Sequence, residues 1–322
     1  MKPRVFVTRE IPDNGLKILK SHCQVKVWPD RLPPTLEELR VEVTNVEGLL
    51  CLLTDEIDAE LMAQAPHLKV ISNYAVGYDN IDVAAAKSRG ITITHTPGVL
   101  TDTTADFAFA LLLAVARRVI EGDRATRSGE WLAWEPTFLL GKEVHRATLG
   151  IVGLGRIGRA LLRRAQGFGM RVLYHDRQRD YELEGKADLT YVSLSDLMQQ
   201  SDFVSIHVPL TDATYHLLAQ PEFEQMKQGA ILINTSRGEV VDEDALVDAL
   251  NKGRLGGAGL DVYSEEPLPL EHPLQGFDNV ILAPHLGSAT VRTRRAMAEI
   301  AANDLVSVLK GTAPCHPVKE GG

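Results

Sequence analysis

The strongest constraint on the fold is a regular alternation of short, nearly uninterrupted apolar segments with stretches of helical period. Strands that read as continuous apolar runs are buried on both faces, and their alternation with helices is typical of parallel α/β sheets. The apolar segments are residues 4–8, 48–54, 68–72, 91–96, 147–153, 171–176, 203–208, 230–235, 258–262 and 279–283. Helices are expected to begin near Asp13, Thr35, Asp58 and Asn80, and a long one to span residues 101–121. The sequence therefore predicts an α/β protein built on parallel sheets.

Length, composition and charge narrow the class of protein. With 322 residues, 44% of them hydrophobic and 24% charged, the chain is expected to form a globular protein of about two domains. A formal net charge of −9 argues against a nucleic-acid-binding surface, which is normally basic. No apolar run approaches the length of a membrane span, and no secretory leader is evident, so no membrane association is expected.

The number and spacing of the cysteines indicate whether the cellular compartment is reducing or oxidising. The chain has three, they are far apart, and none forms a Cys-x-x-Cys pair. An odd and scattered set favours a reducing compartment over a disulfide framework, so a cytoplasmic location is expected. The sequence predicts no metal site.

Two segments that contain both proline and glycine stand out as candidate hinges between domains. Residues 95–102 and residues 284–290 each lead into a helix-start signal. The C-terminal segment, residues 311–322, is rich in glycine, proline and polar residues and is expected to be peripheral or disordered.

A glycine-rich turn predicts the cofactor. Gly153, Gly155 and Gly158 form a Gly-x-Gly-x-x-Gly pattern between an apolar strand and an amphipathic helix. The first glycine permits the tight turn, the second lets a pyrophosphate approach the backbone, and the third lets helix and strand pack closely. The helix N-terminus then faces the phosphates. This context predicts a dinucleotide site rather than a purely structural turn.

The residue that follows the next strand bears on the choice between NAD(H) and NADP(H). Asp176 would accept hydrogen bonds from both ribose hydroxyls and would repel a 2′-phosphate, which favours NAD(H). Arg177 and Arg179 are close enough in sequence to hold that phosphate, so NADP(H) stays possible. The two arginines could equally be solvated charges with no cofactor role.

Three residues of catalytic type follow the glycine turn. Arg237, Glu266 and His285 each lie at or just past the C-terminal end of a predicted strand, the edge at which open α/β sheets bind ligands. An arginine, an acid and a histidine brought together there could bind a carboxylate and move a proton. His207, also at a strand end, is the rival histidine; no paired acid follows it, and we interpret it as a residue of the cofactor side.

The ordered motifs of the chain resemble those of the D-isomer-specific 2-hydroxyacid dehydrogenases, and within them the glyoxylate/hydroxypyruvate reductases. The matching stretches are NYAVGYDNIDV, TPGVLTDTTADFAFALLL, GLGRIG, INTSRGEVVDEDAL, AGLDVYSEEP and PHLGSAT, in this order. The resemblance implies two Rossmann-like domains, one flavodoxin-like and one dinucleotide-binding. Residues 1–98 and 288–322 would form a discontinuous substrate-binding domain, and residues 99–287 an inserted NAD(P)-binding domain. It also implies a homodimer.

The same resemblance implies roles for the catalytic candidates. Arg237 would bind the carboxylate and the carbonyl oxygen of a small 2-oxoacid, a target that suits a planar guanidinium. His285 would protonate the carbonyl oxygen as hydride arrives. Glu266 would orient the imidazole and favour its charged form. Glu265 is the alternative acid, but the family motif puts the acid directly before the proline, here Pro267.

Further site residues follow from the matched motifs. The substrate side would comprise the backbone amides of Val76 and Gly77, together with Leu100, Ser288 and Trp134. The cofactor side would comprise Thr104, Gly153, Leu154, Gly155, Arg156, Ile157, Gly158, Asp176, Arg177, His207, Pro209, Thr235, Ser236, Arg237, Asp261, His285 and Gly287. Asp261 would accept a hydrogen bond from the nicotinamide carboxamide, or else cap a buried loop. Trp134 would limit substrate size from the partner subunit, or else pack in the dimer interface.

The expected activity is reduction of glyoxylate or hydroxypyruvate to the 2-hydroxyacid. Two alternatives stay open at this point. One is a different D-2-hydroxyacid dehydrogenase, such as a short phosphoglycerate dehydrogenase. The other is a non-catalytic, NAD-sensing protein resembling transcriptional corepressors of this fold.

Overall fold

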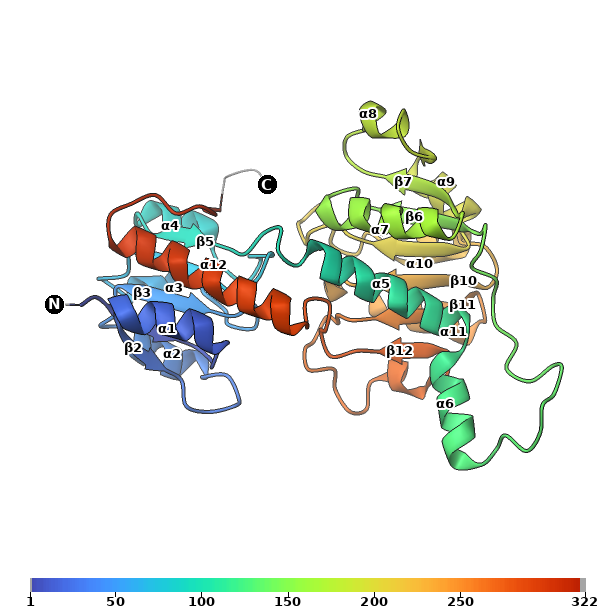
Figure 1. Ribbon diagram of the computed structural model, residues 1–322, viewed down its shortest axis with the longest axis horizontal. Coiled ribbons are helices and arrows are strands. Elements are labelled where there is room, and N and C mark those ends of the chain that lie inside the picture. The colour runs from blue at the N-terminus through green and yellow to red at the C-terminus, as the bar shows by residue number, and fades with distance from the viewer. Residues whose placement is uncertain (1, 319–322) are drawn as a thin grey trace. The chain divides into compact units, whose positions relative to one another are not determined.

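A computed structural model describes residues 2–318 and separates the chain into two compact units. One unit comprises Met1–Leu100 and Ala289–Gly322, and the other comprises Thr101–Ser288. Both divisions fall inside the segments expected as hinges, residues 95–102 and 284–290. Each unit is a parallel β-sheet with helices on both of its faces (Figure 1), as the apolar pattern predicts.

The discontinuous unit holds five parallel strands in the order β2-β1-β3-β4-β5. They are β1 (Arg4–Val7), β2 (Gln24–Val27), β3 (Gly48–Cys51), β4 (Val70–Asn73) and β5 (Thr92–Thr94). Its helices are α1 (Asp13–His22), α2 (Leu36–Val43), α3 (Ala59–Ala63), α4 (Val83–Ser88) and α12 (Val291–Leu309). Helices α1 and α12 lie side by side, and α12 packs on β3 and β4 (Figure 1).

Side-chain caps explain where helices of this unit begin. Thr35 and Glu38 form a reciprocal capping box at the start of α2. Asp58 accepts a hydrogen bond from the Leu61 amide at the start of α3, 2.6 Å away. Asp82 does the same for α4, so this helix begins slightly later than the expected start near Asn80.

The other unit holds seven parallel strands in the order β12-β11-β10-β9-β6-β7-β8. They are β6 (Thr148–Val152), β7 (Arg171–His175), β8 (Leu189–Tyr191), β9 (Phe203–Ile206), β10 (Ala230–Asn234), β11 (Leu255–Leu260) and β12 (Val280–Leu282). Its helices are α5 (Thr101–Ala116), α6 (Val119–Ser128), α7 (Arg156–Gly167), α8 (Tyr181–Glu184), α9 (Leu194–Gln200), α10 (Gln220–Gln225) and α11 (Glu243–Asn251), with short 3₁₀ turns at Gly238–Val240 and Pro273–Gly276. Helices α5 and α7 cover one face of the sheet, and α9, α10 and α11 cover the other.

The strand order creates a switch point in this sheet. From β6 the chain moves outward through β7 and β8, then returns to β9 on the opposite side of β6 and continues to β12. The loops after β6 and after β9 therefore leave the sheet side by side in opposite directions. Open α/β sheets bind ligands in the crevice at such a point.

The expected single helix over residues 101–121 is wrong. Helix α5 ends at Ala116, Arg118 adopts a left-handed conformation with φ of 53°, and α6 starts at Val119. The Lys142 amide donates to the carbonyl oxygen of Ala116 at 2.7 Å. In a continuous helix, the carbonyl oxygen of Ala116 would accept from an amide four residues later. Here it accepts from Lys142 instead.

The C-terminal segment was expected to be peripheral or disordered, and for residues 311–318 it is peripheral but ordered. The Val318 amide donates to the Ile93 carbonyl oxygen at 2.9 Å, and Pro317 forms a β-bridge with Thr94. The segment therefore adds to the edge of the five-stranded sheet at β5. The remainder of the expectation, residues 319–322, lies outside the described residues.

The apolar pattern of the sequence does not predict two of the strands, and both are edge strands. Strand β2 carries Gln24 and Lys26, and β8 is only three residues long. Edge strands lack a second neighbour and tolerate polar side chains, so they lack the continuous apolar run that marks the central strands. Within residues 2–318, no helix combines the length and hydropathy needed to cross a bilayer.

Close packing between α1 and α12 yields a stability prediction. A methyl group added at Gly15 would lie 2.8 Å from both the Cβ and the carbonyl oxygen of Ala298. We expect Gly15→Ala to lower the free energy of unfolding by about 1–3 kcal/mol, as overpacked cores do. The matched control is Gly167→Ala at the end of α7, where a Cβ meets nothing within 4 Å. There alanine should be neutral or stabilising by up to about 1 kcal/mol. Urea denaturation of both variants measures the difference, and equal stabilities would contradict the packing described.

Candidate active site

The turn between β6 and α7 has the features of a phosphate-binding loop. Gly153 has a φ of 94°, and a Cβ there would lie 2.8 Å from the carbonyl carbon of His207. A Cβ at Gly158 would collide with the Gly153 carbonyl oxygen. A Cβ at Gly155 meets nothing within 4 Å, so the backbone there is open to a ligand. Gly155 is also the N-cap of the twelve-residue helix α7 and gives it no side-chain cap.

Asp176 lies at the end of β7 beside this turn. One of its carboxylate oxygens accepts a hydrogen bond from the Leu154 amide at 2.6 Å. Arg179 instead forms an ion pair with Glu184 at 2.8 Å and stacks on Tyr181. Arg177 is exposed. Of the two arginines that could hold a 2′-phosphate, Arg179 is therefore already engaged, and Arg177 is the better placed.

Two shielded polar atoms follow the neighbouring strands. The Nε2 atom of His207, after β9, lies 2.9 Å from the Ser205 hydroxyl, whereas its Nδ1 atom has no partner among the described residues. The hydroxyl of Thr235, after β10, also lacks a partner within residues 2–318. Shielded polar atoms without partners are costly, and a polar ligand at this edge would satisfy them. Together with the open turn at Gly155, they fit a bound dinucleotide.

A histidine–carboxylate pair lies at the same edge of the sheet. Nδ1 of His285 is 2.8 Å from Oε2 of Glu266, and both side chains are about one-quarter exposed, at 26% and 24%. The other Glu266 oxygen accepts from the Tyr263 amide at 3.2 Å. Because Nδ1 donates its hydrogen bond to the Glu266 carboxylate, the other ring nitrogen, Nε2, is available to a substrate.

Asp261 holds the turn that carries this histidine. His285 has a left-handed φ of 55°, and its amide donates to the Asp261 carbonyl oxygen at 3.1 Å. The two carboxylate oxygens of Asp261 accept from the amides of Leu286 at 2.6 Å and Gly287 at 2.7 Å. Burial raises the pKa of Asp261 to about 6, although the two amide bonds act in the opposite direction. These contacts are those of a loop-capping aspartate, one of the two roles considered for it.

Arg237 follows β10 in a turn organised by Asn234. The buried Asn234 side chain donates to the Arg237 carbonyl oxygen at 2.8 Å and accepts from the Ser236 amide at 3.0 Å. A Cβ at Gly238 would collide with the backbone of Tyr263, so this turn packs directly on the segment that leads to Glu266. The structure therefore brings the Arg237 turn and the His285–Glu266 pair together within one unit. Sequence reasoning missed Asn234, although a polar residue that closes an apolar strand is a usable signal.

The other predicted residues are dispersed. Thr104 is buried and contacts the position of Gly287, since a Cβ there would lie 3.3 Å from the Thr104 methyl group. Leu154 is buried, Ile157 and Ser288 are partly buried, and Arg156 and Pro209 are exposed. Val76, Gly77 and Leu100 belong to the other unit. Trp134 is 80% exposed in the segment after α6.

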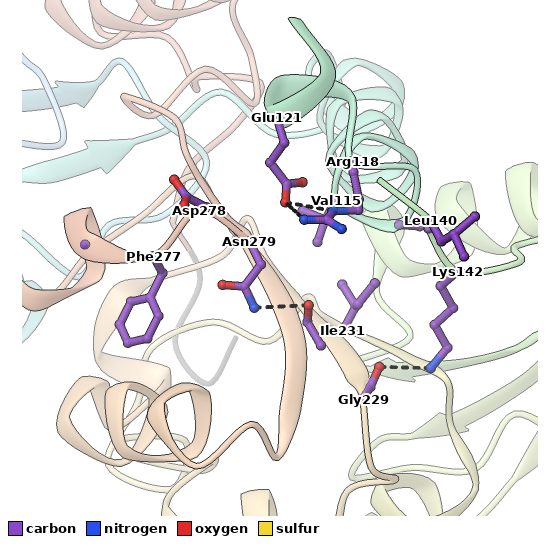
Figure 2. Close-up of a pocket in the computed structure, with 14 residues that line it drawn as sticks. Val115, Arg118, Glu121, Leu140, Lys142, Gly229, Ile231, Phe277, Asp278 and Asn279 are labelled. Atoms are coloured by element: carbon purple, nitrogen blue, oxygen red, sulfur yellow. Dashed lines mark hydrogen bonds and ion pairs between the residues drawn. The ribbon is translucent and has the colours of Figure 1, made fainter. Parts of the chain in front are cut away.

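A hollow of about 720 Å³ in the same unit is not the reaction site. Figure 2 shows that Lys142, Gly229, Ile231 and Asn279 line it, near the amino ends of β10 and β12. The candidate catalytic residues follow the carboxyl ends of the strands, at the opposite edge of the sheet. The polar groups of the hollow also pair with one another, for example the Lys142 ammonium with the Gly229 carbonyl oxygen at 3.0 Å. Across residues 2–318, no cluster of His, Cys, Asp and Glu has the make-up of a metal site.

Comparison with known proteins shows what the chain is similar to. A family model described as "D-isomer specific 2-hydroxyacid dehydrogenase, NAD binding domain" matches residues 109–287. The chain is 52% identical over 321 residues to a glyoxylate reductase of Korarchaeum cryptofilum, covering 99% of this chain and 97% of that protein. A structure from Thermus thermophilus is 48% identical, with a TM-score of 0.93, covering 98% of this chain and 100% of that one. An NADPH-dependent glyoxylate/hydroxypyruvate reductase of Sinorhizobium meliloti, solved with NADP and malonate, is 33% identical with a TM-score of 0.87, covering 99% and 98% of the two chains.

The burial of His207 predicts acid sensitivity. Burial lowers the pKa of His207 to about 4, whereas an unfolded histidine titrates near 6.5. Between these values the unfolded chain binds more protons, so the stability contribution is complete above pH 6.5 and is lost as the pH falls towards 4. The loss is up to about 3 kcal/mol. His207→Gln should flatten the pH dependence of urea unfolding between about pH 8 and about pH 5. The exposed His145→Gln is the control, and identical pH profiles for the two variants would contradict the assignment.

Proposed function

We propose glyoxylate as the substrate of this chain, which belongs to the D-isomer-specific 2-hydroxyacid dehydrogenase family. The chain is an enzyme, an oxidoreductase that uses a nicotinamide cofactor. The reaction is reduction of a small 2-oxoacid to the 2-hydroxyacid, with hydroxypyruvate as a second substrate. The observation that carries the proposal is the 2.8 Å contact between His285 and Glu266 at the carboxyl edge of a dinucleotide-binding sheet.

The proton transfer falls to His285. In the direction of reduction, the protonated imidazole gives its Nε2 proton to the carbonyl oxygen of the oxoacid, which becomes the hydroxyl group. Glu266 holds the ring through Nδ1 and stabilises the positive charge of the imidazolium. The bound nicotinamide supplies the hydride to the carbonyl carbon. In the reverse direction, neutral His285 takes the proton back.

Substrate binding falls to Arg237 and to backbone amides. A guanidinium carries N–H donors in a planar array that matches a carboxylate and an adjacent carbonyl oxygen. The Asn234 contacts fix the backbone from which the Arg237 side chain extends. The amides of Val76 and Gly77 would bind the carboxylate as well.

NAD(H) is the expected cofactor, with NADP(H) possible. Gly153, Gly155 and Gly158 would hold the pyrophosphate at the start of α7, and Asp176 would bind the ribose. The engagement of Arg179 with Glu184 supports NAD(H). The exposed Arg177 keeps a 2′-phosphate possible, and a relative named for NADPH dependence lies at 33% identity.

The assay that tests the function also tests the proton donor. Purified protein should oxidise NADH, followed by absorbance, faster with glyoxylate or hydroxypyruvate than with pyruvate or oxaloacetate. His285→Ala should lower turnover roughly 10²–10⁴-fold, the usual contribution of a positioned general acid. His145→Ala, an exposed histidine in the same unit, should leave turnover unchanged. Near-normal turnover in His285→Ala would remove the proton-donor role. NADH binding without oxidation of any of the four acids would favour a sensor protein or a different acid, such as the substrate of a short phosphoglycerate dehydrogenase.

The segment after α5 supports a homodimer. Helix α6 and the chain that follows it extend away from the sheet (Figure 1). This segment, residues 119–140, exposes an unusual number of large apolar side chains. They are Val119, Ile120, Trp131, Leu132, Trp134, Phe138 and Leu140, exposed by 38% to 89%. Exposed apolar surface of this density marks a protein interface, and a second copy of the chain is the partner we propose.

An acidic substitution in this segment should dissociate the dimer. Leu132→Asp places a charge on a side chain that is 89% exposed and should shift the mass measured by light scattering from two chains to one. Leu270→Asp, at 90% exposure outside the segment, is the matched control and should stay dimeric. A parent protein with the mass of one chain would contradict the proposal.

In the dimer, Trp134→Ala should change the ratio of kcat/KM between glyoxylate and bulkier 2-oxoacids. An unchanged ratio would leave Trp134 a packing role.

A further inference from the structure

The loop after β4 is held by its carbonyl groups. Three successive carbonyl oxygens accept hydrogen bonds from the body of their own unit. The Ala75 oxygen accepts from the Thr96 amide at 2.8 Å, and the Gly77 oxygen accepts from the Asn73 side chain at 2.8 Å. Between them, the Val76 oxygen lies 2.8 Å from Nδ1 of His95. Since a carbonyl oxygen can only accept, Nδ1 of His95 carries the proton in this contact.

These ties determine where the amides of the loop point. In a trans peptide unit, the carbonyl group and the following N–H lie in one plane and face opposite directions. The Val76 carbonyl is directed at His95, so the Gly77 N–H is directed away from it. The Thr96 contact fixes the Val76 N–H in the same way. The contacts at the Ala75 and Val76 carbonyl oxygens thus orient the two amides proposed to bind the substrate carboxylate, and His95 supplies the side chain that holds the peptide between them.

His95 is itself anchored. Its amide donates to the His316 carbonyl oxygen at 3.2 Å, and its ring meets the Tyr78 ring edge-on, with centroids 5.6 Å apart. The segment that supplies His316 is fastened to α12 by the buried Asp304. Asp304 lies 2.8 Å from Nδ1 of His316 and accepts from the Cys315 amide at 2.7 Å. The C-terminal segment, which the sequence suggested to be peripheral or disordered, therefore fixes the backbone of His95.

We propose that His95 is a positioning residue for the substrate carboxylate. Its Nδ1–H holds the Val76 carbonyl and so keeps the Gly77 N–H aimed at a carboxylate oxygen of the 2-oxoacid. This inference rests on the proposed function. Without His95, the peptide between Val76 and Gly77 loses its side-chain hydrogen bond, and its orientation has to be fixed on binding, which weakens the affinity for the carboxylate.

The test compares three variants. His95→Ala should raise KM for glyoxylate about tenfold, the loss expected for one well-oriented hydrogen bond, while the Kd for NADH stays within about twofold. His95→Asn should recover most of the affinity, because its side-chain amide carries an N–H close to the position of Nδ1. His67→Ala, an exposed histidine of the same unit, is the control and should behave as the parent.

A merely structural histidine gives a different result. In that case His95→Ala would lower the unfolding midpoint and kcat together and leave KM for glyoxylate unchanged, which would overturn the proposal. Failure of His95→Asn to recover KM would overturn it too, because ring bulk rather than the N–H would then be the cause.

A second measurement separates this proposal from the proposed function. Oxamate, an unreactive amide analogue of a 2-oxoacid, is titrated by calorimetry into the protein saturated with NADH. If the parent fails to reduce glyoxylate yet binds oxamate, and His95→Ala binds it about tenfold more weakly, the function is wrong and the positioning role stands. Oxamate affinity that does not depend on His95 would overturn the positioning role, whatever the reductase assay gives.

Discussion

Three loops, drawn from both units, depend on one recurring interaction, in which a buried polar side chain at a strand end binds the backbone of a turn at the same edge of its sheet. Asn73 closes β4 and holds the Gly77 carbonyl, and Asn234 closes β10 and holds the Arg237 carbonyl. Asp261 follows β11 and holds the amides of Leu286 and Gly287. Parallel strands end with backbone groups that the sheet no longer pairs, and these groups need partners when they are buried. At the three positions, the hydrogen bonds that pair these backbone groups also fix the conformation of a loop that carries a proposed functional group.

The central strands and the chemistry of the site could be predicted because both leave a local mark in the sequence. A strand buried on two faces is a continuous apolar run, and the glycines between β6 and α7 have the spacing that a phosphate turn requires. Elements whose conformation depends on a distant contact left no such mark. The break between α5 and α6 has no proline or glycine, and it accompanies the contact between Lys142 and Ala116. Residues 315 and 316 are held by Asp304, which is one of two acidic residues in a long helix and has no marked sequence pattern around it.

The supporting residues of the candidate site were harder to predict than the candidate catalytic residues. Arg237, Glu266 and His285 are recognisable because their side chains have the charge or the titration that the reaction needs. Asn234 and His95 act on carbonyl oxygens of neighbouring loops, and that role has no periodicity and no fixed partner type. Asp261 lies between these cases: its chemistry suggested a cofactor contact or a cap, its two amide bonds show a capping contact, and the cofactor contact stays a prediction. Geometry was needed wherever the partner is backbone, because every residue offers the same backbone groups.

This arrangement has a consequence for how affinity and rate are achieved. A backbone amide is a useful donor to an anion only when its direction is fixed before the anion arrives, since ordering a loop on binding reduces the affinity. The same holds for a proton donor, whose contribution depends on its orientation towards the reacting oxygen. In the discontinuous unit, the carbonyl oxygens of residues 75–77 are already engaged; in the other, the turn at His285 is held by Asp261 and the imidazole by Glu266. The orientation of the groups proposed to meet the substrate is therefore established during folding, within each unit separately.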